Sequence, residues 1–403
     1  MKRQRKSFQH ILLFILLFGT MLIFGLIENF KGISYPLIKD EFSASWERQG
    51  LMVSMLSVAY VGFSVVAGIF LGRFGTKPAF LFGFAALCIG LVSVFFMRGF
   101  FGAAASLFVI FIGFGFFEVG INALASRVFI KKAAMLMSLL HSFYGIGAMI
   151  GPKAAGIITD NAGFGWRYVY LFSIPLALVF FIPAIFSRFP EDDSGDVQNT
   201  ANDAVGAVKR KSFFDALRSP MVWLLSVTLG LAIVIEMNSA NWGPMYFRDV
   251  YHLNPSAEGA AFLSAFFLVF TISRLACGPL VERIGYMKTL IGLSFIIMTI
   301  FIVGFFMGEK GIFVLPGQGF FIALLWPTIM AIAIVVFGRD APVFSSAMIA
   351  IGGLINAAVQ FLIGLTNKIG PAWGYRSTLV YTALLIIMLM ILNVKLKKPD
   401  KGK

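Results

Sequence analysis

A glutamate lies in the middle of one of the most apolar stretches of the chain, GFGFFEVGINALASRVF at positions 113–129. In a helix that rises about 1.5 Å per residue, Glu118 lies roughly 13 Å from Arg127 and shares a face with Asn122 at i+4. A carboxyl group in the middle of such an apolar helix can carry a proton or accept hydrogen bonds from the hydroxyls of a solute. The alternative is that it forms a structural pair with a neighbouring helix. Since ionisable groups inside a membrane are functional by default, we interpret Glu118 as a proton-coupling residue and Asn122 as a solute contact.

Two further acids, Glu28 and Glu236, also fall inside apolar stretches, whereas the other acids fall in loops, tails or the ends of such stretches. A charge at the centre of a bilayer costs about 2.5–3.5 kcal/mol even on the lenient insertion scale. These acids must therefore face a cavity, a partner or one another. Glu28 and Lys31 stand at i and i+3, which predicts either a local ion pair or a solute contact. We count Glu28 among the candidate proton-coupling residues and Glu236 among the candidate solute contacts.

The stretch IEMNSANWGPMYF carries two amides, an indole and a helix-breaking pair. Asn238 and Asn241 stand at i and i+3 and share a face, and Trp242 follows. Amides beside an indole suit a ligand such as a sugar, through hydrogen bonds to hydroxyls and stacking on a ring, although amides also hold membrane helices together. Gly243 and Pro244 predict an interruption of the helix that acts as a gate hinge.

The stretch LLHSFYGIGAMIGP adds a histidine and a tyrosine to the polar candidates. His141 can exchange protons with Glu118, although a lone buried histidine is as often a satisfied structural group. Tyr144 is a candidate solute contact. No acid stands near His141 in the sequence and nothing outlines an oxyanion hole, which argues against a serine hydrolase. Small residues in this stretch let helices approach closely: Gly145, Gly147 and Gly151.

A few more polar groups complete the candidate site. The remaining predicted solute contacts are Gln318, Trp326, Asn356 and Gln360. The last two stand at i and i+4 and share a face. Arg274 lies near the end of its apolar stretch, where we expect a structural role or a side chain that extends to the aqueous surface.

The elements that carry these residues are expected to be transmembrane helices. Of the 403 residues, 59% are hydrophobic and 13% charged, and the mean hydropathy is +0.88, against about 25% charged residues in a globular domain. Apolar runs of about 20 residues, long enough to cross a bilayer, recur throughout. They predict an all-α integral membrane protein with twelve helices at about 11–36, 50–72, 79–97, 104–129, 135–158, 168–187, 221–245, 258–281, 288–307, 312–337, 345–366 and 377–394.

The distribution of positive charge predicts the orientation of the chain. If both termini are cytoplasmic, the inner segments hold 22 Lys and Arg and the outer segments hold 8. The net charge of +14 is therefore an orientation signal and not a nucleic-acid footprint. The basic start of the chain is not followed by a small-residue cleavage site, so we expect the first apolar run to remain as a helix of a cell-membrane protein. Cys88 and Cys277 give no redox or metal signal.

The chain divides into two halves that resemble each other. A polar segment separates them, which predicts six-helix bundles at 1–187 and 221–403 joined by a cytoplasmic linker at 188–220. GIFLGRFGTK aligns with GPLVERIGYMK at an offset of 210, and GFGFF aligns with GQGFF at an offset of 204. Two pseudo-symmetric halves are typical of alternating-access transporters.

The segment GIFLGRFGTK (68–77) resembles the cytoplasmic motif G-x-L-x-D-R-x-G-R-K of the major facilitator superfamily. One difference is that Gly72 occupies the position of the motif's aspartate, whereas Glu282 occupies the acidic position in the second half. The resemblance implies the fold of that superfamily, with a gating charge relay that is weak in the first half or shifted to the second. The gating residues that it implies are Gly68, Arg73, Gly75, Lys77, Arg127, Glu282 and Arg283.

A narrower resemblance is to the group of fucose and glucose permeases, which are proton symporters. It rests on E-x-x-x-N at 118–122, HSFYGIGAMIGP, and E-x-N-x-x-N-W at 236–242. It implies a protonation site at Glu118 and a sugar contact at His141. Fucose permease has an aspartate four residues before a proline of the first helix; that position is Gly32 here, with Glu28 one turn away.

These observations predict a secondary transporter, a proton-coupled symporter of a sugar or other small polar solute across the cytoplasmic membrane. A proton-linked exporter of drugs or metabolites is the alternative, since the same glutamate would serve it and the many Phe and Met residues could line its pocket. An enzyme is not expected. We expect no cofactor beyond the proton gradient, no nucleic-acid partner, and a monomer in the lipid bilayer that binds a small-molecule substrate.

Overall fold

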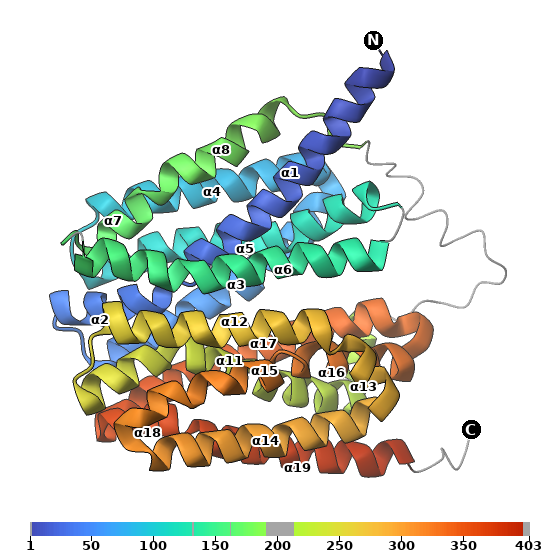
Figure 1. Cartoon of the computed structure of the whole chain (residues 1–403). Coiled ribbons are helices and arrows are strands. Elements are labelled where there is room, and N and C mark those ends of the chain that lie inside the picture. The colour runs from blue at the N-terminus through green and yellow to red at the C-terminus, as the bar shows by residue number, and fades with distance from the viewer. Residues whose placement is uncertain (1, 131–132, 162, 191–212, 398–403) are drawn as a thin grey trace.

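The computed structural model describes residues 2–130, 133–161, 163–190 and 213–397, and every regular element in them is a helix (Figure 1). The first half contains α1 (Lys2–Glu28), α2 (Lys31–Glu41), α3 (Trp46–Phe74), α4 (Thr76–Phe96), α5 (Phe100–Val128), α6 (Ala133–Gly156), η1 (Ile157–Asn161), α7 (Trp166–Leu171) and α8 (Ser173–Phe186).

The second half begins after the segment 191–212. This segment makes up most of the predicted linker and lies outside the described residues. It contains α10 (Phe213–Leu217), α11 (Pro220–Tyr251), η2 (Pro255–Gly259), α12 (Ala260–Ala276), α13 (Gly278–Ile284), α14 (Tyr286–Phe306), η3 (Gly308–Phe313), η4 (Leu315–Gly317), α15 (Gln318–Ile322), α16 (Leu325–Phe337), η5 (Gly338–Asp340), α17 (Ala341–Ile369), α18 (Pro371–Arg376) and α19 (Thr378–Lys397).

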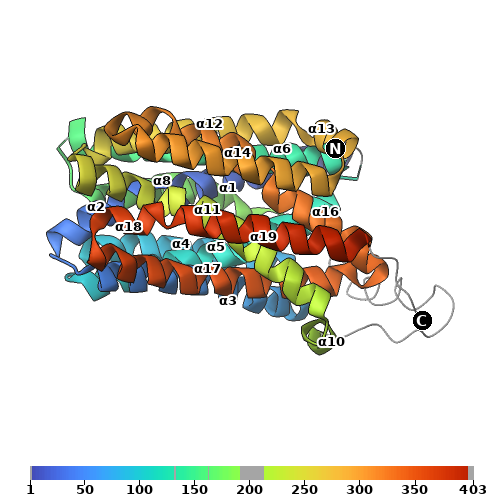
Figure 2. The same cartoon turned by 90° about the horizontal axis from the view of Figure 1, so that it is seen from below.

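The helices form two bundles side by side, one from each half (Figure 1); seen from below, the second bundle lies in front of the first (Figure 2). Within the described residues, 12 helical segments are long and apolar enough to cross a membrane, six in each half. This confirms the predicted all-α fold of twelve spans. We call the end where α1 begins and α19 ends the terminal end, and the end where α2 and α11 finish the opposite end.

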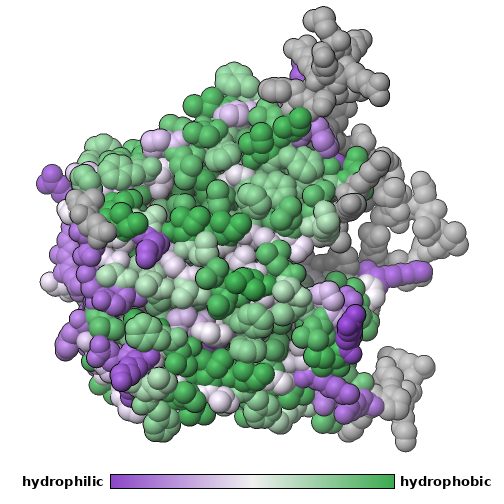
Figure 3. Space-filling view, in the orientation of Figure 1, coloured by the Kyte–Doolittle hydropathy of each residue, from purple (hydrophilic) through white to green (hydrophobic). Residues whose placement is uncertain are grey.

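The surface is apolar where a soluble protein would be polar. Hydrophobic side chains cover the flank of both bundles, and hydrophilic side chains gather at the opposite end (Figure 3). Large apolar side chains are among the most exposed, including Phe306 at 89% and Ile69 at 70%. Such a surface is stable in contact with lipid and unstable in contact with water.

Several predicted helices are broken in the structure. The first span is divided near Asn29, whose side-chain Nδ2 donates to the Gly25 carbonyl at 2.8 Å. The eighth is divided at Cys277, before Pro279, which lacks an N–H and is suited to the start of a helix. The tenth is divided into η4, α15 and α16 around Pro316 and Leu324.

The interruption predicted at Gly243 and Pro244 is wrong, because α11 continues through both residues to Tyr251. Both residues are buried: an added Cβ on Gly243 would meet the Phe262 ring at 2.6 Å, and Pro244 packs against Gly259. Helices in membranes tolerate proline where neighbouring helices hold the backbone in place. Since Gly243 and Pro244 both lie within a continuous helix, the local backbone gives no support to a hinge at this point.

Close packing of α1 against α6 depends on glycine, as predicted. A Cβ on Gly25 would lie 2.0 Å from the Tyr144 carbonyl oxygen. A Cβ on Gly147 would lie 2.1 Å from the carbonyl oxygen of Leu22, and one on Gly151 would lie 2.3 Å from the backbone oxygen of Leu26. Because these neighbours are backbone atoms, a side chain can be accommodated only by moving the helices apart.

We predict that Gly147→Ala destabilises the protein by about 1–3 kcal/mol or more, because overpacking here displaces backbone. Thermal unfolding of the purified protein in detergent measures this as a lower midpoint. Gly72→Ala is the matched control, since its added Cβ meets nothing within 4 Å. Equal midpoints for the two variants would contradict this account of the α1–α6 contact.

The two halves share a local feature at the positions that the sequence repeat aligns. Gly75 separates α3 from α4 with φ of 88°, and Gly285 separates α13 from α14 with φ of 91°. These dihedrals favour glycine because a Cβ is strained at positive φ. The offset of 210 residues in the sequence therefore corresponds to the same turn in each half.

Candidate functional site

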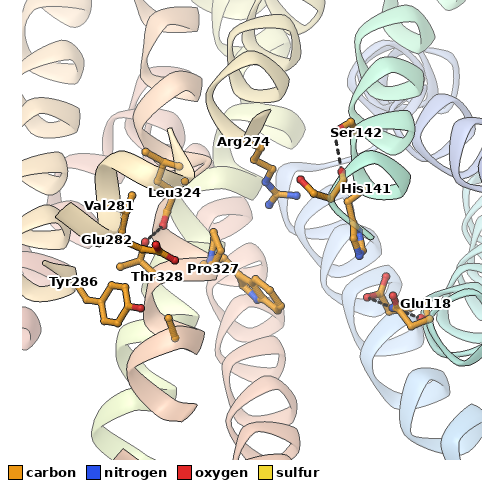
Figure 4. A pocket seen from close by; sticks show the side chains of 15 residues that line it. Glu118, His141, Ser142, Arg274, Val281, Glu282, Tyr286, Leu324, Pro327 and Thr328 are labelled. Atoms are coloured by element: carbon orange, nitrogen blue, oxygen red, sulfur yellow. Dashed lines mark hydrogen bonds between the residues drawn. The ribbon is translucent and has the colours of Figure 1, made fainter. Parts of the chain in front are cut away.

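A cavity of ≈ 480 Å³ lies between the two halves and is lined by both (Figure 4). Two of its exposed lining residues, Ser138 and Glu282, lie near the start of α6 and the end of α13, at the terminal end of the molecule. The cavity therefore opens toward that end. The lining residues are Glu118, Asn122, Ser138, His141 and Ser142 from the first half, and Arg274, Gly278, Val281, Glu282, Tyr286, Leu324, Trp326, Pro327, Thr328 and Ala331 from the second.

Glu118 is half-buried on α5 and is held by hydrogen bonds from two side chains. The Tyr60 hydroxyl of α3 donates to its Oε2 at 3.1 Å. Asn122 Nδ2 donates to its backbone carbonyl at 2.6 Å and to its Oε1 at 3.4 Å. The structure thus brings Glu118 and Asn122 together on one cavity wall. Tyr60 was missed because it is distant in sequence, and no local spacing relates it to Glu118.

Arg274 and His141 lie on opposite walls of the cavity. Figure 4 shows the guanidinium of Arg274, on α12, directed across the cavity toward α6, which carries His141 and Ser142. Arg274 Nε donates to the Ala323 carbonyl at 3.4 Å, and its guanidinium carbon lies 4.4 Å from the centre of the Phe270 ring. The ring and the carbonyl hold this half-buried side chain beside the cavity, which fits the structural role expected as one of its two alternatives.

A second charged group lies at the break between α1 and α2. Lys31 Nζ is 2.8 Å from Glu28 Oε1, so the ion pair suggested by their spacing is present. The hydroxyl of Tyr144 donates to Glu28 Oε2 at 2.5 Å. Lys31 also lies 3.9 Å from the sulfur of Met237, next to Glu236 on α11 of the other half. Glu28, Tyr144 and Glu236 do not line the ≈ 480 Å³ cavity in this conformation.

Most of the predicted amide contacts lie away from the cavity and are buried in the second half. Trp242 Nε1 and Asn241 Nδ2 both donate to Gln360 Oε1, at 2.7 and 3.3 Å. Gln360 Nε2 donates to Asn356 Oδ1 at 3.0 Å, and Asn238 Nδ2 donates to Thr378 Oγ1 at 3.0 Å. We call Asn238, Asn241, Trp242, Asn356 and Gln360 the amide cluster. Trp326 alone among the predicted contacts of this half lines the cavity.

Gln318 forms a neighbouring contact on α15, where its Nε2 donates to Ser239 Oγ at 2.8 Å and to the Tyr375 hydroxyl at 3.0 Å. The carbonyl oxygens of the side chains of Gln318 and Asn241 are buried without a hydrogen-bond partner in the described structure. An unpaired buried acceptor costs about 1–3 kcal/mol, which a water or a solute can offset. The amides are therefore packed together but not fully satisfied.

At the opposite end the two halves are joined by polar contacts, which we call the latch. Arg248 of α11 donates to Asp40 Oδ2 and to the Pro36 carbonyl, each at 2.8 Å. Thr159 and Ser256 hydroxyls are 2.8 Å apart, and Asn254 Nδ2 donates to Asp160 Oδ1 at 3.0 Å. A more exposed pair, Lys368–Glu47, spans the halves at 2.6 Å. The conformation is thus closed at the opposite end and open at the terminal end.

The motif residues lie at the terminal end. Lys77 Nζ donates to the carbonyls of Ile185 at 2.7 Å and Ser187 at 2.8 Å, which ties the start of α4 to the end of α8. Arg73, Glu282 and Arg283 are exposed. Gly68 and Gly72 have open space beside them, and Arg127 lies in the last turn of α5. Within the described residues, no group of His, Cys, Asp and Glu could hold a metal ion.

Comparison with known proteins decides the family. A family model of the Major Facilitator Superfamily matches residues 13–342. The chain belongs to the Major Facilitator Superfamily. It is consequently a transporter of that superfamily and not an enzyme, as the sequence predicts, and a multi-pass membrane protein with a small-molecule substrate.

Relatives within the superfamily are distant. Bypass of stop codon protein 6 of Saccharomyces cerevisiae is 22% identical over 383 residues, which cover 85% of this chain and 74% of that protein. A TsgA homologue of Buchnera aphidicola is 21% identical over 380 residues, which cover 93% and 90%. Neither name states a substrate.

Two solved superfamily structures match the fold. The nucleoside transporter NupG has a TM-score of 0.73 at 12% identity, with 97% of this chain and 100% of that chain covered. The fucose:proton symporter FucP of E. coli has a TM-score of 0.63 at 17% identity, with 95% and 99% covered. At these identities the likeness concerns the fold, so the narrower resemblance to fucose and glucose permeases stays a prediction.

We predict that Arg248→Ala opens the opposite end of this superfamily transporter, because the side chain of Arg248 is only 12% exposed and binds two groups of the other half. Spin labels at Arg98→Cys and Lys310→Cys, in a background with both native cysteines replaced by serine, report the separation of the halves. We expect the distance distribution to shift to longer values.

Lys368→Ala is the control for the latch, since Lys368 is 69% exposed and surface ion pairs contribute about 0–1 kcal/mol. Its distance distribution should stay close to that of the parent. A larger shift with Lys368→Ala than with Arg248→Ala would contradict the assignment of the latch.

Proposed function

We propose that the protein is a proton-coupled secondary transporter that carries a small polar solute, with Glu118 as the coupling acid. The observation that carries this proposal is the position of Glu118, which lines a cavity between the two halves that opens toward the terminal end. A volume of ≈ 480 Å³ is within the range of sites for small molecules, about 300–1,000 Å³.

The lining favours a polar solute. Asn122, Ser142 and Thr328 offer hydrogen-bonding groups, and Trp326 and Tyr286 offer ring faces beside them. Groups of this kind suit a solute with hydroxyls and a compact carbon skeleton. A sugar fits this description, as do other hydroxylated metabolites.

Glu118 is placed to exchange a proton with the cavity. The charged groups that face it are Glu28 on α1 and Arg274 on α12; the Tyr60 hydroxyl donates a hydrogen bond to it, and His141 lines the same cavity. Protonation removes the negative charge of Glu118. The positive charge of Arg274, on the other side of the cavity, is then less compensated. Protonation and solute binding are therefore coupled through the same cavity.

Rocking of the two halves would give the solute access from each side in turn. The latch holds the opposite end closed here, and its opening would accompany closure of the terminal end. Asn238, Asn241 and Trp242 of the amide cluster precede Arg248 of the latch along α11, so we propose that the cluster contacts solute when the opposite end is open. In this proposal the terminal end is cytoplasmic, as the distribution of Lys and Arg indicates.

The experiment is solute uptake into proteoliposomes under an imposed pH gradient. The solute used is the one that most raises the unfolding temperature of the purified protein in a panel of sugars, polyols, nucleosides, hydroxy acids and polar drugs. One pH unit is worth about 1.4 kcal/mol, so one proton per solute sustains about tenfold accumulation.

We predict that Glu118→Gln abolishes this accumulation but retains exchange of labelled for unlabelled solute, because the amide keeps the shape of the side chain without its proton. Glu309→Gln, at an exposed glutamate, is the control. Accumulation by the Glu118→Gln protein that equals the parent would refute the role of Glu118. If cationic amphiphiles were the only molecules that raise the unfolding temperature of the protein, the result would instead support a proton-linked exporter.

A further inference from the structure

Arg274 is a cavity residue to which the proposed function assigns no contact with the solute, and the inference below rests on that function. Its guanidinium is fixed from two directions, by the Phe270 ring beneath it and by the bond from Nε to the Ala323 carbonyl. The remaining N–H groups are directed into the cavity (Figure 4). A guanidinium held in this way presents two parallel donors to whatever occupies the space.

Within the described residues, Arg274 forms no ion pair with an acid. The acids that face it are Glu118 on α5 and Glu236 on α11, and His141 on α6 lines the cavity opposite. Glu282 lies at the exposed mouth. None of these carboxylates contacts the guanidinium directly, so the gap between Arg274 and α6 is open to a ligand.

We propose that the transported solute carries a carboxylate, which binds the guanidinium of Arg274. Arginine and a carboxylate form two parallel charge-assisted hydrogen bonds, a geometry that the fixed guanidinium is ready to supply. The rest of the solute then faces Asn122, Ser142 and Thr328, which suit hydroxyl groups. The class is a small hydroxylated carboxylic acid.

Charge compensation links this anion to the coupling proton. When Glu118 is ionised, its negative charge faces Arg274 across the cavity and repels a second anion. When Glu118 is protonated, that charge is removed and Arg274 attracts the carboxylate. One anion and one proton thus enter together, and their combined movement across the membrane carries no net charge.

The binding experiment compares carboxylates with neutral molecules of matched carbon number. The probes are gluconate with sorbitol, glucuronate with glucose, and glycerate with glycerol, tested by thermal shift and by calorimetric titration of the full chain in detergent. We expect at least one carboxylate to bind, with an affinity at least about tenfold above its neutral partner, because an ionic hydrogen bond contributes about 1.5–3 kcal/mol. Binding of neutral members alone, or of no carboxylate in the panel, overturns the proposal.

Substitutions then test whether Arg274 is responsible. Arg274→Gln should weaken carboxylate binding by roughly 10- to 100-fold and leave the neutral partner unchanged. Arg274→Lys keeps the charge but not the paired donors, so its loss should be smaller. Arg98→Gln, at an exposed arginine of the opposite end, is the matched control and should bind as the parent does.

If Arg274 only balances the charge of Glu118 and Glu236, its substitution lowers the unfolding temperature without changing the preference for carboxylates, and the proposal is wrong. Should Arg274→Gln fail to fold, Arg274→Lys with a monodisperse elution profile gives the same comparison.

Transport separates this inference from the proposed function. Uptake of the carboxylate should respond to a pH gradient and not to a potassium-valinomycin potential. Proton-driven uptake of a neutral solute that is stimulated by the potential would refute the proposal that the solute is a carboxylate, while leaving the role of Glu118 intact. Uptake of the carboxylate that ignores the pH gradient would refute proton coupling while leaving the Arg274 site intact.

Discussion

The whole structure depends on one constraint: polar groups within the spans have no water to bind, so each must find a partner in the protein or in a cavity. Most of them pair within the bundle. Glu28 binds Lys31 and Tyr144, and the amide cluster satisfies most of its groups internally. Glu118 and Arg274 are different, since part of each faces an open space shared by the two halves. The proposed function rests on these exceptions.

The same constraint explains why two groups of contacts lie at opposite ends of the interface between the halves. The latch places Arg248 and its partners where the halves meet, and the cavity lies where they part. In this conformation the polar groups of the latch are bound by protein, whereas those of the cavity face open space. α11, which carries both Arg248 and part of the amide cluster, is continuous between them, whereas the first, eighth and tenth spans are interrupted.

How much the sequence predicts depends on the range of the interaction. The twelve spans and the contacts within a turn, such as Glu118 with Asn122 and Glu28 with Lys31, follow from hydropathy and helical spacing. Contacts between helices do not. Nothing local relates Tyr60 to Glu118 or directs Arg274 into the cavity, and the packing around Pro244 outweighs its tendency to break a helix. The burial of the amides could not be predicted either. Helical spacing shows which residues share a face, but it does not show what that face contacts.

The bond between Lys77 and the end of α8 has a mechanical consequence. The two carbonyls that it binds, on Ile185 and Ser187, lie at the end of α8, among the last described residues of the first half. Tension along that connection is therefore transmitted to the start of α4 as well as to α8. The hydrogen bonds from Lys77 thus couple the end of the sixth span to the start of the third.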